Sequence, residues 1–255
     1  LPRMLDIVRI PVLKDNYVWL VKAGPDLAVV DPAVDGPVEA VLAARGWRLT
    51  HILNTHHHND HVGANLVLKA RHGCTIVGPR ADRERIPGLD VEVGEGETYA
   101  LGGRQARVFD VPGHTRGHIA YWFEADGALF CGDTLFALGC GRLFEGTPAQ
   151  MWDSLSKLRA LPDDTRVHCA HEYTQSNARF ALRVDPENAA LRARARAVDE
   201  ARARDEATVP SRLGDEKATN PFLRADDPVL ARAMGLAGRP PAEVFAAIRA
   251  AKDRF

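Results

Sequence analysis

Short apolar runs and apolar–polar alternation fill the first two thirds of the chain, and both patterns predict strands. The predicted strands cover residues 4–13, 16–21, 26–30, 49–53, 74–78, 105–111, 118–123, 128–131 and 166–170. Apolar residues at helical spacing predict helices over residues 38–44, 64–71 and 147–161. Strands and helices mixed in this order favour a layered α/β fold with the helices outside.

The pattern changes at about residue 172. Beyond it the strand patterns end, and helical stretches rich in Ala, Arg and Glu are separated by prolines. Residues 173–255 contain 15 Lys and Arg against 12 Asp and Glu, so this part is slightly basic. We therefore expect two domains, residues 1–172 and residues 173–255, the second built of helices. The alternating arginines of residues 192–196 predict a solvated helix face, because acidic residues follow directly.

Composition and charge exclude several classes of protein. The chain has 255 residues, of which 45% are hydrophobic and 26% charged, and its net charge is −1. These values are typical of a globular protein and provide no global field that attracts nucleic acid or a membrane surface. The first residues lack the apolar segment of a secretory signal, and the four cysteines lack CxxC spacing. We expect a cytoplasmic protein with reduced thiols.

Histidine is concentrated in one part of the chain. All ten histidines lie between His51 and His171, and the run Thr55–His61 holds four of them together with Asp60. Imidazole and carboxylate are ligands suited to zinc, iron or manganese. Taken alone, the run is also compatible with a structural zinc site or with a chance cluster.

Three later residues favour a catalytic metal centre. His114, Asp133 and His171 each follow a different predicted strand, so side chains from several strand ends can converge. Seven ligands suffice for two ions, with Asp133 able to bridge them. The predicted ligands are His56, His58 and His114 for one ion, Asp60, His61 and His171 for the other, and Asp133 between them.

The motif HxHxDH, followed by these three residues, resembles the metallo-β-lactamase superfamily. The resemblance covers about residues 4–172 and implies an αββα sandwich of two sheets. The remaining histidines match no ligand position and are interpreted as polar or packing residues: His51, His57, His72, His118 and His168. Asp31 has two interpretations, either as the acceptor of an N–H from a ligand imidazole or as a turn residue before Pro32.

The C-terminal part of the chain resembles one particular family of this superfamily. Residues 220–224 and 245–253 are similar to the helical domain of glyoxalase II, the hydroxyacylglutathione hydrolases, and so are residues 15–17, 139–142 and 171–174. The resemblance then covers almost the whole chain. It implies a monomeric enzyme that cleaves S-D-lactoylglutathione to glutathione and D-lactate, the second step of methylglyoxal detoxification.

The same resemblance implies the substrate-binding residues. Arg249 and Lys252 are three residues apart on a predicted helix and offer two cations to the carboxylates of glutathione. A simpler interpretation is a cationic last helical turn favoured by the helix dipole. Arg142 and Tyr173 match positions of the family. Phe144 departs from it, because tyrosine is common there and phenylalanine cannot donate a hydroxyl.

The resemblance also implies a mechanism. Two divalent ions, zinc in the first place and iron or manganese as alternatives, hold a hydroxide that attacks the thioester carbonyl. Asp60 and Asp133 are the predicted catalytic residues, since they position this nucleophile. Three other functions remain open: a persulfide dioxygenase with one iron, a lactamase, and a glutathione-binding module without turnover.

Overall fold

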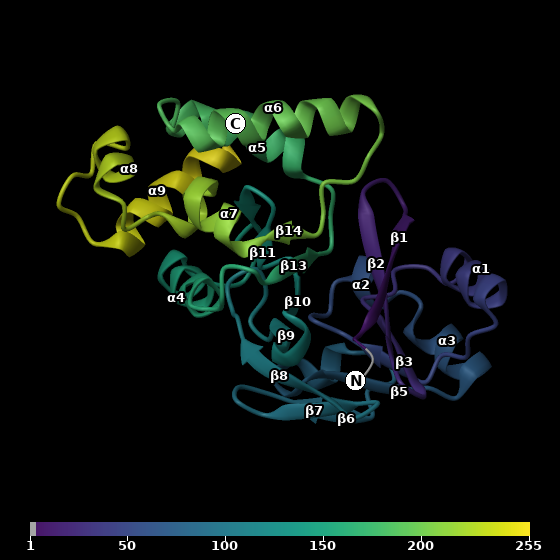
Figure 1. Cartoon of the computed structure of the whole chain (residues 1–255). Helices are drawn as coiled ribbons and strands as arrows, with labels where there is room; N and C mark the ends of the chain where they lie inside the picture. The colour runs from purple at the N-terminus through teal and green to yellow at the C-terminus, as the bar shows by residue number, and fades with distance from the viewer. Residues whose placement is uncertain (1–3) are drawn as a thin grey trace. The chain divides into compact units, whose positions relative to one another are not determined.

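The computed structural model describes residues 4–255, so the first three residues of the predicted first domain lie outside it. The chain forms two compact units (Figure 1). Unit 1 comprises the described residues up to Asp110 together with Arg116–Gly132, and unit 2 comprises Val111–Thr115 together with Asp133–Phe255. The predicted domain boundary at residue 172 remains a prediction.

A six-stranded sheet forms the centre of unit 1. Its strands follow the order of the chain: β1 (Asp6–Val12), β2 (Asn16–Ala23), β3 (Asp26–Val30), β4 (His51–Leu53), β5 (Thr75–Pro79) and β6 (Val91–Val93). The first three strands are antiparallel hairpins, whereas β3 to β6 pair in parallel. Parallel pairing brings the carboxyl ends of β3 and β4 to the same edge of the sheet, where polar side chains can meet.

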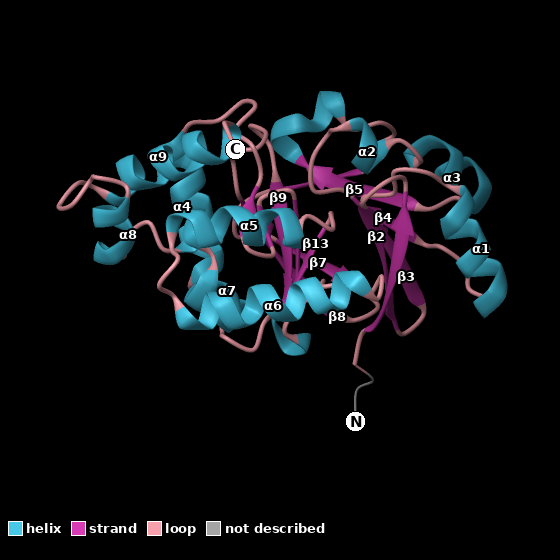
Figure 2. Ribbon diagram, turned by 90° about the horizontal axis from the view of Figure 1, so that it is seen from above, coloured by secondary structure: helices cyan, strands magenta, loops and turns pink. Residues whose placement is uncertain are grey.

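Helices cover the outer face of this sheet. Helix α1 (Gly36–Arg45) and helix α3 (Asn65–His72) lie along β3 and β4 in Figure 2 and match the predicted helices. Their buried leucines Leu42 and Leu68 join Leu20, Val29 and Ile52 of the sheet in one apolar core. This packing stabilises helices that are too short to persist alone in water. The four-residue helix α2 (Asn59–Val62) contains Asp60 and His61, the last two residues of the histidine run.

A second, antiparallel set of strands completes unit 1. It contains β7 (Thr98–Leu101), β8 (Arg104–Asp110), β9 (Ile119–Phe123) and β10 (Ala128–Gly132), paired in the order of the chain. The two layers of strands touch through buried aromatic residues: the rings of Trp19 and Phe130 lie 6.5 Å apart, and the Tyr121 hydroxyl donates to the Asn54 carbonyl at 2.8 Å. Unit 1 is thus a two-sheet structure with helices outside: the hydrophobic pattern predicted the layered arrangement, and the family resemblance implied the two sheets.

Unit 2 is mainly helical. Its helices are α4 (Pro148–Arg159), α5 (Thr174–Val184), α6 (Ala189–Ala203), α7 (Leu213–Thr219), α8 (Pro228–Ala233) and α9 (Pro241–Asp253). Its strands are β11 (Leu135–Phe136), β12 (Gly139–Cys140), β13 (Arg166–Cys169) and β14 (Ser211–Arg212). The predicted helical part is interrupted by β14, which pairs with β13 through Arg166 and Val167. Two residues are too few to produce a strand pattern in a sequence.

One apolar core of unit 2 lies between two helices. Helices α5 and α6 share a buried cluster with Leu138, formed by Ala178, Ala181, Leu191 and Ala195. No helix within residues 4–255 is long and apolar enough to cross a membrane. All four cysteines are buried and unbridged, which agrees with the predicted reduced thiols.

Candidate metal centre

The histidine run lies at the carboxyl end of β4 in unit 1. His56 and His61 are fully buried, and the ring of His56 lies 4.1 Å from that of His61 and 4.8 Å from that of His58, measured between centroids. Helix α2 begins at Asn59, and one helical turn brings His61 back towards His56. The local fold therefore gathers the three predicted histidine ligands of this run.

Asp31 holds this histidine loop in place. Its carboxylate accepts hydrogen bonds from the backbone N–H and the hydroxyl of Thr55 at 2.8 and 2.6 Å. It also lies 3.0 Å from Nδ1 of His61. Nδ1 of His56 lies 2.9 Å from the Thr55 hydroxyl oxygen, so Asp31 orients both rings. Asp31 thus lies at hydrogen-bond distance from the imidazole of a predicted ligand, as one of its two interpretations expects.

Asp31 is also a turn residue. Its φ of +51° lies in the left-handed region, which aspartate tolerates better than most residues. Asp31 therefore lies in a turn and also beside His61. The three buried hydrogen bonds to its carboxylate offset the cost of this backbone conformation.

Asp60 is the most accessible predicted ligand of unit 1, with a side chain 40% exposed. Its Oδ2 lies 3.3 Å from Nε2 of His61 and accepts a hydrogen bond of 3.0 Å from the side-chain amide of Asn16. The same amide donates to the Asp60 carbonyl at 3.2 Å. The sequence marks Asn16 only as part of a family motif, and its contact with Asp60 was not predicted.

The other three predicted ligands meet in unit 2. Oδ2 of Asp133 lies 3.4 Å from Nε2 of His114, and Oδ1 lies 3.3 Å from Nε2 of His171. All three residues are buried. The two oxygens of one carboxylate thus face two different imidazoles, which is the arrangement expected of a carboxylate that bridges two ions.

The turn that carries His114 is fixed from several sides. Nδ1 of His114 lies 2.8 Å from the Arg142 carbonyl, which leaves Nε2 directed at Asp133. The preceding Gly113 has a φ of +152°, and a Cβ at this position would lie 2.8 Å from the sulfur of Met151 on α4. The Pro112 carbonyl accepts from the hydroxyl of Ser154 on the same helix at 2.7 Å.

Two aromatic residues flank the histidines of unit 2. The Tyr173 ring stacks on that of His171 with centroids 4.7 Å apart and planes at 2°. The Phe144 ring meets that of His114 edge to face at 5.2 Å and is 63% exposed. Both predicted substrate residues therefore lie beside predicted metal ligands.

The predicted basic residues of unit 2 share one electrostatic environment. The pKa of Lys252 lies below its ordinary value of 10.5, because burial disfavours its charge and the cations Arg249 and Arg142 repel it. Arg249 is only 5% exposed and donates to the Cys140 carbonyl at 2.8 Å and to Asp253 at 2.8 and 3.0 Å. Arg249 thus has a structural role in the fold, whatever it binds.

The five remaining histidines have structural surroundings. His118 is buried and stacks on His56 with centroids 4.5 Å apart and planes at 18°. Nδ1 of His57 lies 3.7 Å from the carboxylate of the buried Asp82. His51 and His72 are partly buried, and His168 is buried.

Donor pairs within each unit have the spacing of ligands on a divalent metal ion. Two ligand atoms on one tetrahedral ion are about 3.3–3.4 Å apart when each bond is about 2.0–2.1 Å long. The pairs Asp60–His61, His114–Asp133 and His171–Asp133 have separations of 3.3, 3.4 and 3.3 Å between a carboxylate oxygen and an imidazole nitrogen. Nitrogen and oxygen ligands alone suit zinc, iron and manganese alike.

Comparison with known proteins gives full-length matches. Residues 13–171 match the model of the metallo-beta-lactamase superfamily, and residues 172–255 match that of the hydroxyacylglutathione hydrolase C-terminus. The chain is 61% identical to the hydroxyacylglutathione hydrolase of Methylococcus capsulatus, with 99% of each chain covered. It is 57% identical to the enzyme of that name from Rhodospirillum rubrum, covering 98% of this chain and 99% of the other.

A solved structure supports the fold. The crystal structure of TTHA1623 in a di-iron-bound form superposes with a TM-score of 0.61 at 26% identity, covering 86% of this chain and all of the other. The predicted α/β fold of the metallo-β-lactamase type with C-terminal helices is confirmed.

Proposed function

Because this chain belongs to the metallo-β-lactamase superfamily and, within it, to the hydroxyacylglutathione hydrolases, we propose that it hydrolyses S-D-lactoylglutathione to glutathione and D-lactate. The observation that carries the proposal is the match of the C-terminal 84 residues as well as the metal-binding part. The superfamily fold alone supports many hydrolytic reactions. The predicted assignment to the glyoxalase II family and to the hydrolases is confirmed.

We propose that seven side chains are ligands of two divalent ions: His56, His58, Asp60, His61, His114, Asp133 and His171. Zinc is the first choice, with iron and manganese as alternatives, and the di-iron form of TTHA1623 agrees with a pair of ions. Such ions, when bound, polarise a carbonyl and lower the pKa of water to about 7.

The protein's own groups position the reaction. Asp133 presents its two oxygens in different directions, towards His114 and His171, and would be a ligand of both ions when they are bound. Asn16 donates to Asp60 and thereby orients that carboxylate. The glutathione thiolate is a good leaving group, so no protein acid is required for the cleavage.

The substrate is held by residues of unit 2. The cations Arg142, Arg249 and Lys252 attract the carboxylates of a glutathione thioester, and Tyr173 offers a hydroxyl beside His171. Phe144 adds an exposed aromatic surface beside His114 in place of the hydroxyl that tyrosine supplies in relatives. The contacts of Arg249 and Lys252 with the carboxylates of glutathione are remote from the scissile bond, so we expect these two residues to act on KM rather than on kcat.

We also propose the finer organisation of the protein. The catalytic domain comprises residues 1–172 and the substrate domain residues 173–255, in agreement with family matches that meet at residues 171 and 172. The chain acts as a monomer in the cytoplasm, a compartment in which four unbridged cysteines stay reduced. Size-exclusion chromatography with light scattering tests the monomer.

The test is a spectrophotometric assay of the thioester band of S-D-lactoylglutathione. We expect the metal-loaded wild-type protein to consume the thioester, and Asp133→Ala to lose at least about 100-fold in kcat, because it disturbs the nucleophile. A variant that keeps both wild-type kcat and full metal content would remove Asp133 from the site. Binding of glutathione thioesters without turnover would refute the enzyme, and oxygen consumption with glutathione persulfide would favour a dioxygenase.

A further inference from the structure

The segment from Asp133 to Arg142 touches all three proposed metal ligands of unit 2. It begins with Asp133, continues through β11 and β12, and ends at Arg142, whose carbonyl lies 2.8 Å from Nδ1 of His114. The ring of Phe136 on β11 meets the ring of His171 edge to face, with centroids 5.9 Å apart. The position of this segment, the ligand hairpin, therefore bears on the geometry of the whole ligand group.

The base of the ligand hairpin is closed tightly. The N–H of Gly141 donates to the Thr134 carbonyl at 3.2 Å. A Cβ at Gly141 would lie 2.0 Å from the carbonyl oxygen of Asp133 and 2.9 Å from Nδ1 of His114. Because there is no room for even a methyl group, a displacement of the hairpin is passed on to both proposed ligands.

The tip of the ligand hairpin is not fixed by its own strands. β11 and β12 contain two residues each, and so short a pair of strands is not stable by itself. Leu138, which lies between them, has a φ of +59°, a left-handed conformation that costs energy in a leucine. Such a conformation persists only where the surrounding structure holds it.

Two fully buried side chains of the C-terminal part hold this tip. Oε1 of Glu216 on α7 accepts a hydrogen bond from the Leu138 N–H at 2.8 Å. The side-chain amide of Asn220, directly after α7, donates to the carbonyls of Phe136 and Gly139 at 3.1 Å each. Backbone groups of three residues at the tip thus have partners on one short segment of the chain.

A third buried side chain reaches the tip from α5. The amide of Asn177 donates to the Ala137 carbonyl at 3.1 Å. A Cβ at Gly139 would lie 2.4 Å from the same amide nitrogen, so α5 and the tip are in close contact. Each of the residues 136–139 therefore has a backbone group bonded to a side chain of residues 173–255.

Glu216 is held in turn by both of its carboxylate oxygens. Oε2 accepts from the guanidinium of Arg194 on α6, which also donates to the Thr219 hydroxyl at 2.9 Å. Oε1 accepts from the side-chain amide of Asn220 at 3.3 Å. A buried polar network with all its bonds made rigidifies its surroundings, and removing one member leaves the others unsatisfied. The packing of α6 and α7 thus fixes the ligand hairpin.

We propose that Asn177, Glu216 and Asn220 are positioning residues of the metal centre, an inference that rests on the ligand roles proposed above. They act through the ligand hairpin and touch no reacting atom. The C-terminal helices then support the metal ions in addition to binding glutathione. The two tasks are separable, because a misplaced ligand hairpin lowers metal affinity and kcat, whereas a lost substrate contact raises KM.

The experiment measures zinc affinity by competition between the zinc-loaded protein and a chromophoric chelator. We expect Asn220→Ala and Glu216→Ala to weaken zinc binding about 10-fold or more, the usual effect of losing groups that orient metal ligands. Asn177→Ala removes one hydrogen bond and weakens zinc binding about 3-fold, and it serves alone if the other two variants do not fold. Unchanged zinc affinity in the folded variants of this set would overturn the proposal.

Glu216→Gln tests the hydrogen bond itself. Its amide oxygen still accepts from the Leu138 N–H, so we expect zinc affinity within about 3-fold of wild type despite the lost charge. Equal losses in Glu216→Gln and Glu216→Ala would assign the effect to the charge and overturn the action through the hairpin.

Asp185→Ala is the matched control. Asp185 is a buried carboxylate of unit 2 that pairs with Arg224, as Glu216 pairs with Arg194, and it also accepts from Asn188. We expect Asp185→Ala to lower Tm as Glu216→Ala does and to leave zinc affinity unchanged. An equal loss of zinc affinity would assign the effect to general destabilisation and overturn the proposal.

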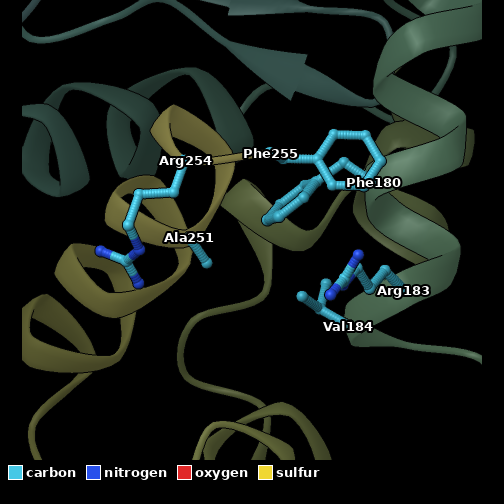
Figure 3. Close-up of a pocket in the computed structure, with 6 residues that line it drawn as sticks. All are labelled: Phe180, Arg183, Val184, Ala251, Arg254 and Phe255. Atoms are coloured by element: carbon cyan, nitrogen blue, oxygen red, sulfur yellow. The ribbon is translucent and has the colours of Figure 1, made fainter.

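Arg183→Ala is the control for Asn177→Ala on the same helix. Arg183 is exposed and lines a pocket between the ends of α5 and α9, where its guanidinium lies 5.7 Å from the centroid of the Phe255 ring (Figure 3). We expect unchanged zinc affinity in Arg183→Ala. A loss as large as that in Asn177→Ala would overturn the assignment of Asn177.

Failure of the function and failure of the positioning are distinguishable. If the wild-type protein does not hydrolyse S-D-lactoylglutathione, the proposed function is refuted, and the zinc competition still decides the positioning. In the active enzyme we expect Asn220→Ala to lower kcat about 10-fold, with KM within about twofold. A raised KM with unchanged kcat and zinc affinity would restrict the C-terminal helices to substrate binding and overturn the proposal.

Discussion

At the scale of single residues, polar groups far apart in the sequence are joined by short hydrogen bonds. Asp31 illustrates this, because one carboxylate holds the backbone of Thr55 and the ring of His61, 24 and 30 residues away. Buried polar groups need such partners, and their removal costs about 1–3 kcal/mol for each unsatisfied group. The orientation of a metal ligand therefore depends on a residue outside the ligand set.

The two basic residues of α9 differ at this scale. Arg249 is buried, and its guanidinium donates to Cys140 and Asp253 and lies 5.1 Å from the ring centroid of Phe222. Lys252 is partly exposed, and its ammonium lies 5.9 Å from the ring centroids of Phe180 and Phe255. Both interpretations of the pair taken from the sequence therefore remain open, with Lys252 the clearer test of substrate binding.

We predict that Lys252→Ala raises KM about 5- to 10-fold, with kcat within about twofold, because it removes a charged contact to the substrate carboxylates.

Since the pKa of Lys252 is lowered by burial and by Arg249, its charge is lost at a lower pH than that of an ordinary lysine. The KM of the wild type therefore rises with pH below 10.5, and Lys252→Arg, which keeps its charge, abolishes this rise. Steady-state kinetics at several pH values measures this dependence of KM on pH.

We expect Arg249→Ala to differ from Lys252→Ala, because Arg249 also has a structural role. We expect it to raise KM and also to lower the free energy of unfolding by about 1–3 kcal/mol, because the hydrogen bonds to Cys140 and Asp253 are lost. Thermal unfolding beside kinetics separates the two effects. An unchanged KM in both Lys252→Ala and Arg249→Ala would contradict a glutathione site on α9.

At the scale of elements, helix α4 supports the turn that carries His114. The helix begins with a capping box, in which the Gln150 backbone N–H donates to the Thr147 hydroxyl at 3.2 Å and the Thr147 N–H donates to the Gln150 side chain at 2.9 Å. Just before it, the N–H of Gly146 donates to the Gly113 carbonyl at 2.9 Å. The start of α4 and the metal-ligand turn are thus anchored together.

We predict that Thr147→Ala lowers the free energy of unfolding by about 1 kcal/mol, the usual cost of losing an N-cap. For a protein of this size that corresponds to a decrease of about 2–4 °C in Tm. Thr147→Ser keeps the hydroxyl and should retain wild-type Tm, as measured by circular dichroism. Equal Tm values in all three proteins would mean that the capping box does not contribute to stability.

At the scale of the whole molecule, the predicted ligands are divided between two compact units, four in unit 1 and three in unit 2. Each group is preorganised within its own unit, by Asp31 in unit 1 and by the Arg142 carbonyl in unit 2. Binding of ions to native ligands stabilises the folded state by an amount that rises with the logarithm of the affinity for them.

We predict two metal ions per chain in metal-replete protein, because seven ligands exceed the need of one ion. Removal by a chelator should abolish turnover and lower Tm, and both should return when zinc, iron or manganese is added. Elemental analysis measures the metal content, and calorimetry measures the change in Tm. A content of one ion per chain, or full activity of the metal-free protein, would exclude the two-ion mechanism.

The sequence alone determined the elements that are long or periodic and the chemistry of the ligands. Strands β1 to β5 and helices α1, α3 and α4 were predicted within a few residues, because each has a repeating apolar face. Strands β6, β7, β11, β12 and β14 were missed, because each has only two to four residues, whereas the equally short β4 was found through the longer apolar run 49–53. The candidate metal ligands were identified because a solvated turn rarely contains four histidines within seven residues, and the family motif supplied the rest.

Only the tertiary structure decided how the side chains are used. Nothing local in the sequence indicates that Asp31 reaches His61, that Arg249 is buried against Cys140, or that Arg183 and Arg254 share a pocket. Burial and hydrogen bonding depend on which elements pack together, and packing is settled by contacts between residues distant in the chain. The sequence therefore indicates the type of chemistry, and the fold shows which charged residues are held in buried contacts.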